Sequence, residues 1–194
     1  MPAAVVARAV PFDELTLRRA QRGDERAWRD LIERFERPVH ALIWRLLAGR
    51  ARHRVEDLTQ ETFVRVLGAL PRFDPTGPAT LSTWILTIAA RITLNELRRP
   101  ELAALVVEPV ANERTDASAE RKRLGAAIAT GVAALPDGQR AVLVLADYHE
   151  LSYAEIAGVL ALDVGTVKSR LSRARGALRA HLLAALPELG VRHD

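Results

Sequence analysis

The chain has 194 residues, of which 49% are hydrophobic, 27% are charged and only 5% are aromatic, a composition that favours helices over strands in a folded soluble protein. The absence of cysteine excludes disulfide bonds, thiol catalysis and Cys-ligated zinc. A formal net charge of +4 permits an anionic partner but does not establish one. No stretch approaches the roughly 18 apolar residues that span a bilayer, and residues 1–10 are too short for a secretory signal, so we expect a cytoplasmic protein without membrane insertion.

Helical periodicity accounts for most of the first hundred residues. Apolar residues at three- and four-residue spacing predict helices over 12–22 and 24–48, and Pro38 is expected to kink or divide the second of these. A further helix is predicted over 55–70 and is followed by a proline-rich loop over 71–80. Thr80 is a candidate N-cap for a helix that runs to residue 99 and ends before Pro100.

Periodicity is lost between residues 100 and 118, which hold four acidic side chains and one basic one and predict an acidic, flexible linker. It returns over 120–135 and 138–148. Ser152 and Glu155 have the spacing of a capping box at the start of a short helix to residue 160, and Asp163 can cap a last helix over 164–185. The predicted fold is all-α, with one small helical domain over residues 13–99, a linker over 100–118 and a second domain over 119–186.

The last two predicted helices, 153–160 and 164–185, have the length and separation of a helix-turn-helix unit. On the second helix, one face is apolar and is expected to pack inward through Val167, Leu171, Ala174 and Leu178. Residues 164–181 also carry five Lys or Arg and no Asp or Glu. A solvated basic helix would have the same charge pattern, but the capped short helix before it favours a helix that enters the major groove of DNA.

Two motifs in this unit, LSYAEIA and VGTVKSRLSRAR, resemble the σ4 domain of the extracytoplasmic-function (ECF) sigma factors, a subfamily of the sigma-70 family. The resemblance implies a domain that reads the promoter −35 element. Ala161 stands where the family usually has a turn glycine, and Asp163 stands where a proline is frequent; an alanine costs about 1 kcal/mol in a left-handed conformation. The implied −35 contacts are Thr166, Lys168, Ser169, Arg170 and Arg173.

The helix predicted over 55–70 carries Asp57, Gln60 and Glu61 at spacings that place them on one outward face. Taken alone, this pattern is more typical of a solvated face with a Glu61–Arg65 ion pair. The segment DLTQETFVRVLGALPRFDP, however, resembles the σ2 domain of the same family. The resemblance implies that these three residues bind the clamp of the β′ subunit of core RNA polymerase, while other parts of the chain contact the β subunit.

The next segment, LSTWILTIAARITLNELRR, resembles the σ2 helix that approaches the promoter −10 element. Its basic and amide side chains suit contacts with phosphates or with an unstacked base, and the loop 73–80 is implied to form a pocket wall for that base. Trp84 could stack on a base, but its apolar neighbours favour the core. The family often has Asn where this chain has Arg91 and an acidic residue where it has Asn95. The candidate −10 contacts are Phe73, Asp74, Arg91, Asn95, Arg98 and Arg99.

Both resemblances occur in the family's order across residues 13–185 and predict a sigma factor that directs core RNA polymerase to promoter DNA. The acidic linker is implied to thread the polymerase channel that RNA later takes, and an anti-sigma protein is an implied partner. The alternative is a helix-turn-helix regulator that acts without joining the polymerase. An enzyme is disfavoured because the five histidines are scattered and the chain has no HExxH motif and no glycine-rich phosphate loop. We therefore expect no catalytic residue, no cofactor and no metal site.

Overall fold

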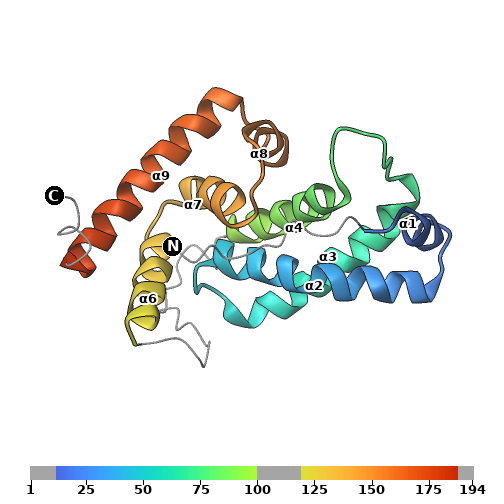
Figure 1. Cartoon of the computed structure of the whole chain (residues 1–194), viewed down its shortest axis with the longest axis horizontal. Coiled ribbons are helices and arrows are strands. Elements are labelled where there is room, and N and C mark those ends of the chain that lie inside the picture. Colours follow the sequence, from blue (N-terminus) through green and yellow to red (C-terminus); the bar gives the residue numbers. More distant parts are fainter. Residues whose placement is uncertain (1–11, 100–118, 188–194) are drawn as a thin grey trace.

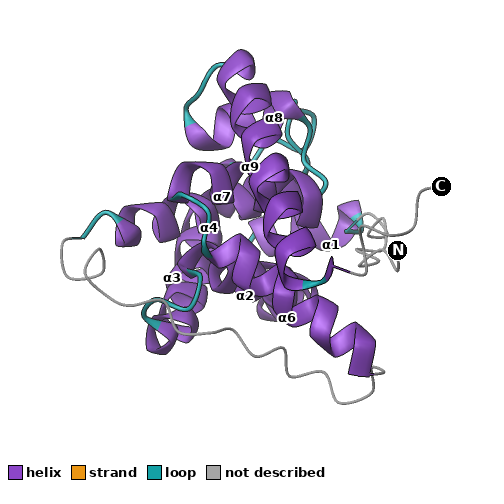
Figure 2. Ribbon diagram, turned by 90° about the vertical axis from the view of Figure 1, so that its left-hand side faces the viewer, coloured by secondary structure: helices purple, strands orange, loops and turns teal. Residues whose placement is uncertain are grey.

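The structure is a computed structural model that describes residues 12–99 and 119–187, so the predicted linker lies outside the described residues. Within these two ranges every regular element is helical, as Figure 2 shows, which confirms the predicted all-α class. No helix in the same ranges is long and apolar enough to cross a membrane. The domain boundaries at residues 99 and 119 stay predictions, because the segment between them is not described.

The first domain begins with capped helices and ends with the helix that carries the candidate −10 contacts. The carboxylates of Asp13 and Asp24 and the hydroxyl of Thr80 accept hydrogen bonds from first-turn backbone amides at 2.9, 3.0 and 3.1 Å. The Thr80 cap confirms the predicted start of the last helix. In chain order the elements are α1 (Glu14–Gln21), α2 (Glu25–Leu47), η1 (Arg52–Arg54), α3 (Val55–Ala69), η2 (Leu70–Arg72) and α4 (Leu81–Leu97).

Pro38 does not divide α2, which continues from Glu25 to Leu47, so that part of the prediction is wrong. Buried residues on both sides of the proline form one stripe: Leu31, Phe35, Val39 and Leu42. Burying one such side chain contributes about 1.5–3 kcal/mol. The stripe therefore outweighs the roughly 3 kcal/mol that an internal proline costs a helix.

The core of the first domain lies where α2, α3 and α4 pack against one another, and α1 packs on α2 (Figure 1). The inward face of α3 packs into this core, and Leu67 at its edge is only half-buried. Its fully packed members are Val55, Leu58, Phe63, Val66 and the following Leu70.

The second domain consists of α6 (Ala119–Ala133), α7 (Asp137–Leu143), the π-helical segment η3 (Val144–Tyr148), α8 (Tyr153–Leu160) and α9 (Val164–Ala185). The capping box is present: the Ser152 hydroxyl accepts from the Glu155 amide at 3.3 Å, and the Glu155 carboxylate accepts from the Ser152 amide at 2.8 Å. Asp163 caps α9 by accepting from the Thr166 amide at 2.6 Å. The bounds of α8 and α9 are those predicted.

Ala161, the turn residue between α8 and α9, adopts the left-handed conformation, with φ 52° and ψ 49°. Its amide donates to the carbonyl of Ala157 and so closes α8. The turn thus has the geometry for which glycine is the usual residue, although this chain places an alanine there.

The two domains pack directly on each other. In Figure 1 the second domain, coloured yellow to red, lies against the blue-to-green first domain, with α7 and α8 next to α2 and α4. Contacts join α4 to α8, α2 to α7 and α2 to η3. The described parts of the chain therefore form one body, with a hydrophobic core that continues from the first domain into the second.

Candidate nucleic-acid interface

The outward face of α9 is the candidate surface for the −35 element. The predicted apolar stripe faces inward, with Val167, Leu171 and Ala174 fully buried. Lys168, Ser169 and Arg173 are exposed on the other side, while Thr166 and Arg170 are half-buried. This arrangement offers cationic and hydroxyl groups on a helix that the rest of the domain supports from behind, as a helix in the major groove requires.

Hydrogen bonds within α9 orient Arg173, and a glycine on α7 leaves space for Arg170. The Arg173 guanidinium donates to the backbone oxygen and the hydroxyl of Ser169 at 3.2 and 3.3 Å, which aligns it along the helix. A Cβ added at Gly138 would lie 2.9 Å from an Arg170 nitrogen, so the glycine makes room for that side chain.

Two acidic residues next to α9, Asp163 and Asp147, reduce the positive charge of its surface. The Thr166 hydroxyl donates to Asp163 at 2.5 Å, and this bond, with the Thr166 amide, lowers the pKa of the Asp163 carboxyl and keeps it anionic at the start of the helix. Arg175 forms an ion pair with Asp147 at 2.5 Å. Arg175 therefore already has an anionic partner in η3, although the pair is partly exposed and contributes roughly 0–1 kcal/mol.

The candidate polymerase face on α3 is exposed. Asp57 and Gln60 lie on the surface and Glu61 is half-buried. Asp57 pairs with Arg54 at 2.8 Å, and Glu61 pairs with Arg65 at 2.5 Å. The Glu61–Arg65 pair expected of a solvated face is therefore present, but ion pairs this exposed are worth roughly 0–1 kcal/mol and can be exchanged for contacts with a partner.

The candidate −10 residues on α4 lie along its exposed side and around its C-terminus. Arg91, Asn95, Arg98 and Arg99 are all exposed. Arg98 donates to the Asn95 side-chain oxygen at 3.3 Å. Arg91 is already engaged, because its guanidinium donates to carbonyls of α8 in the other domain.

Phe73 is buried, so this residue does not line an open pocket, while the pocket wall expected of the rest of the loop, residues 74–80, stays a prediction. Its ring packs on Trp84 with centroids 4.9 Å apart, and the Gln21 amide donates to its backbone oxygen at 2.7 Å. Trp84 is half-buried against the same core, as its apolar neighbours predict. Asp74, the next residue, is exposed and accepts from the Thr76 amide and hydroxyl, which lowers the pKa of its carboxyl.

The sequence patterns missed two buried charged residues, Glu96 and Arg140, and the second role of Glu155. Glu96 is 7% exposed and pairs with Arg54 at 3.1 Å and Arg99 at 3.3 Å, so it links the polymerase face to the end of α4. Arg140 is buried, and Glu155 serves both its own capping box and the other domain. Only the charge of Glu96 and Arg140 at otherwise apolar positions of helical periodicity could have indicated them. Among the described residues, no group of three or more His, Cys, Asp or Glu could hold a metal ion.

Comparison with known proteins assigns both domains to one family. The family model of sigma-70 region 2 matches residues 31–101, and the model of sigma-70 region 4 matches residues 126–178. These segments contain the two candidate DNA-binding helices and the polar face of α3. The two region models together define a sigma-70 type protein.

Similar proteins narrow the assignment. The chain is 30% identical over 183 residues to "ECF RNA polymerase sigma factor SigW" of Bacillus subtilis, covering 86% of this chain and 94% of that one. It is 34% identical over 170 residues to "ECF RNA polymerase sigma factor SigE" of Mycolicibacterium smegmatis, covering 82% of this chain but only 64% of that one. A solved structure titled "Structure of CnrH in complex with the cytosolic domain of CnrY" matches at 29% identity, with a TM-score of 0.63, over 89% of this chain and 98% of that one.

The chain therefore belongs to the ECF sigma factors of the sigma-70 family. Sigma factors are transcription initiation factors. This membership supports a sigma factor over the alternative of a helix-turn-helix regulator that acts without RNA polymerase.

Proposed function

We propose that this chain binds core RNA polymerase through Asp57, Gln60 and Glu61 on α3, captures the −10 element with α4 and reads the −35 element with α9. The polymerase supplies nucleotidyl transfer, and the chain has no catalytic residue of its own. It works in the cytoplasm, where the polymerase and the chromosome are. Additional contacts of the second domain with the β subunit, and control by an anti-sigma protein, complete the proposal by analogy with the family.

The observation that carries the proposal is the pairing of two different surfaces on one chain. The outer face of α9 offers exposed Lys168, Ser169 and Arg173, which suit phosphates and base edges. The outer face of α3 offers an amide and two carboxylates; the carboxylates repel DNA and suit a cationic protein surface instead. A simple DNA-binding regulator has no use for the second surface.

The test separates the two surfaces. Arg173→Ala should reduce promoter-directed transcription by about fivefold or more, because a lost guanidinium contact to a base costs about 1–3 kcal/mol, while binding to core polymerase is unchanged. Gln60→Ala should weaken binding to core polymerase. Run-off transcription on a promoter library and equilibrium binding to purified core polymerase measure the two effects.

Arg29→Ala on α2 is the matched control for the lost charge, because Arg29 is an exposed arginine whose side chain is 72% accessible. It should leave both readouts near those of the unaltered protein. If Arg173→Ala and Gln60→Ala fail identically at polymerase binding, the proposed division of labour is wrong. If the unaltered chain does not bind core polymerase at all, the proposed function itself is wrong.

A further inference from the structure

The first helix of the helix-turn-helix unit, α8, is held at both of its ends by α4. Near its N-terminus, the Thr83 hydroxyl donates to Glu155 Oε1 at 2.7 Å, while Glu155 Oε2 accepts from Ser152 in the capping box. Near its C-terminus, Arg91 Nη2 donates to the Gly158 carbonyl at 3.1 Å, and Arg91 Nε donates to the Val159 carbonyl at 3.4 Å.

These carbonyls belong to the last turn of α8, where intrahelical partners are lacking. A helix C-terminus also carries partial negative charge, which a guanidinium stabilises. Arg91 therefore binds the end of α8 with the same donors that it would offer to a phosphate or a base.

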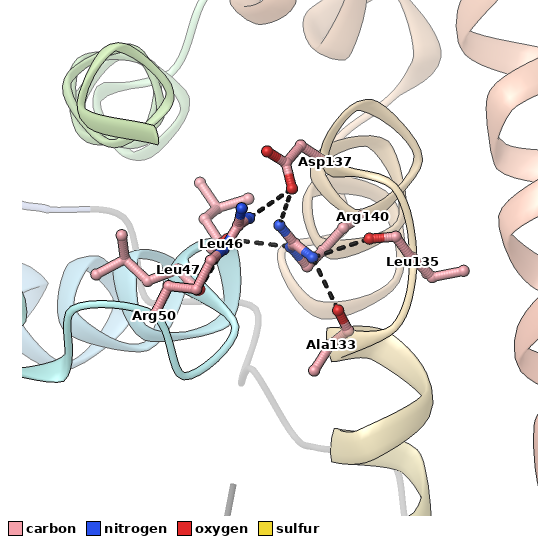
Figure 3. Close-up of polar contacts among 7 residues, drawn as sticks. All are labelled: Leu46, Leu47, Arg50, Ala133, Leu135, Asp137 and Arg140. Atoms are coloured by element: carbon pink, nitrogen blue, oxygen red, sulfur yellow. Dashed lines mark hydrogen bonds and ion pairs between the residues drawn. The ribbon is translucent and has the colours of Figure 1, made fainter. Parts of the chain in front are cut away.

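A second contact, shown in Figure 3, joins α7 to the end of α2. Arg140 is 2% exposed and donates from Nε to the Leu46 carbonyl of the first domain at 3.0 Å. It also bonds the Asp137 carboxylate, which pairs in turn with Arg50 of the first domain at 2.5 Å. One carboxylate thus lies between two guanidiniums from different domains.

A third contact lies between the same helix α2 and η3. The Arg45 guanidinium lies 4.3 Å from the centre of the Tyr148 ring, a cation–π arrangement. The three contacts involve different elements of the second domain, so they fix the orientation of the two domains as well as their proximity.

We propose that this packing is a closed, self-inhibited state of the sigma factor, in which α8 occupies Arg91 and withholds the −10 surface of α4 from DNA. The inference rests on the proposed function, because it takes Arg91 as a −10 contact. Promoter binding requires the domains to separate, so the apparent affinity for DNA equals the affinity of the open form multiplied by the fraction of molecules that is open. The Arg50–Asp137 pair stabilises closure without belonging to any candidate DNA or polymerase contact.

The test uses the absence of cysteine from the chain, which makes introduced thiols unique. In the full chain, Arg50→Cys combined with Asp137→Cys allows the two domains to be joined by a short bismaleimide with a reducible centre. The single variant Arg50→Cys, treated with the same reagent, is the matched control. Two readouts are compared: binding to a pool of short random-sequence single-stranded DNA, and run-off transcription with core polymerase on a promoter library.

We expect the joined protein to lose at least about tenfold in both readouts, and reduction of the linker to restore them. Adding Arg91→Ala should weaken DNA binding of the unjoined protein but have no effect on the joined protein, since α8 already occupies Arg91 there. Circular dichroism checks the fold. If Asp137→Cys disturbs it, Arg45→Cys with Tyr148→Cys offers a second pair across the interface.

The outcomes distinguish the two proposals. If the joined protein binds DNA and transcribes as well as the reduced one, closure does not inhibit and the inference is overturned. An equal effect of Arg91→Ala in both forms also overturns it, because Arg91 would then be available in the closed state. If the unjoined protein does not direct transcription by core polymerase, the proposed function fails, and the inference fails with it.

Discussion

Replacing Arg140 by methionine should lower the free energy of unfolding by about 3 kcal/mol in all, of which about 2 kcal/mol falls on the second domain. The guanidinium donates to the carbonyls of Ala133 and Leu135 at 3.0 and 2.9 Å and to that of Leu46 at 3.0 Å, so it closes the C-terminal ends of α6 and α2 together. Methionine fills much of the aliphatic volume but donates nothing, so these acceptors lose their partner.

The magnitude follows from the carbonyls. A buried polar group left unsatisfied costs about 1–3 kcal/mol, and three such groups give a loss of about 3 kcal/mol or more. Asp137 adds little to this sum, because its side chain is 44% exposed and water can replace the guanidinium. Removing one partner of a fully buried pair, by comparison, costs about 3–5 kcal/mol.

Urea unfolding measures the effect with two probes. The three tryptophans, Trp28, Trp44 and Trp84, all lie in the first domain, so their fluorescence follows that domain alone, whereas far-UV circular dichroism follows both. The variant should shift the dichroism transition of the second domain strongly. The fluorescence transition should move by only about 1 kcal/mol, for the single bond to Leu46.

Arg179→Met makes the same side-chain change on the exposed surface of α9 and should shift stability by no more than about 0.5 kcal/mol. If Arg140→Met costs no more than this control, the buried guanidinium is not what holds the two helix ends. Its role in closing α6 and α2 would then be refuted.

Three further residues have local geometries that lead to predictions. Ala161→Gly should raise the free energy of unfolding in urea by about 0.5–1 kcal/mol, because glycine relieves the left-handed strain of the turn and loses only part of that gain to its freer unfolded chain. Burial and the nearby Arg45 guanidinium lower the pKa of His149 to about 4, so folding stability should fall by up to about 3 kcal/mol as pH drops from 6.5 to 4 and should be level above 6.5. Glu96→Gln should cost about 1–2 kcal/mol in thermal or urea unfolding, because Arg54 and Arg99 lose a buried anionic partner but are partly solvated themselves.

Each of these expectations has a result that contradicts it. Ala154→Gly, within α8, should destabilise by about 1 kcal/mol, and an equal loss from Ala161→Gly would deny the strain at the turn. Stability falls in acid because the unfolded chain binds a proton at His149 below about pH 6.5, while the buried ring in the folded protein stays neutral until about pH 4. A His149→Gln protein with the same acid profile would assign the loss to other groups. A Glu96→Gln protein as stable as the original would show that the carboxylate is not needed.

Features that depend on neighbouring residues were predictable from the sequence. The caps at Thr80, Ser152 and Asp163 bond amides within three residues, and the inward stripe of α9 repeats with the helical period, so each leaves a local pattern. The expected division of the helix at Pro38 does not occur. The cost of the proline is local and visible in the sequence, whereas the burial that outweighs it involves packing against α3 and α4.

Contacts between distant residues left no such pattern. The Thr83–Glu155 bond joins positions 72 apart and the Arg140–Leu46 bond joins positions 94 apart. The residues around Phe73 are typical of a loop, so its burial was not predictable from the sequence. In the folded chain its ring packs on Trp84 and its backbone oxygen accepts from Gln21. The charge and hydroxyl content of α9 was readable from sequence, but the occupation of Arg91 by α8 was not, because it requires the relative position of the domains.

The arginine at position 91 has a consequence for how such proteins can be recombined. ECF sigma factors look modular, and a chimera would join the first domain of one to the second domain of another. Here the donor that meets the end of α8 is a long arginine side chain, and a shorter side chain would not span the same gap. A chimera with a shorter side chain there would keep both helices proposed to bind DNA yet lose the two bonds from this position to α8. Under the two proposals made above, one substitution at position 91 would change both the preference for a −10 sequence and the fraction of molecules in the closed state. Neither property could then be altered without the other.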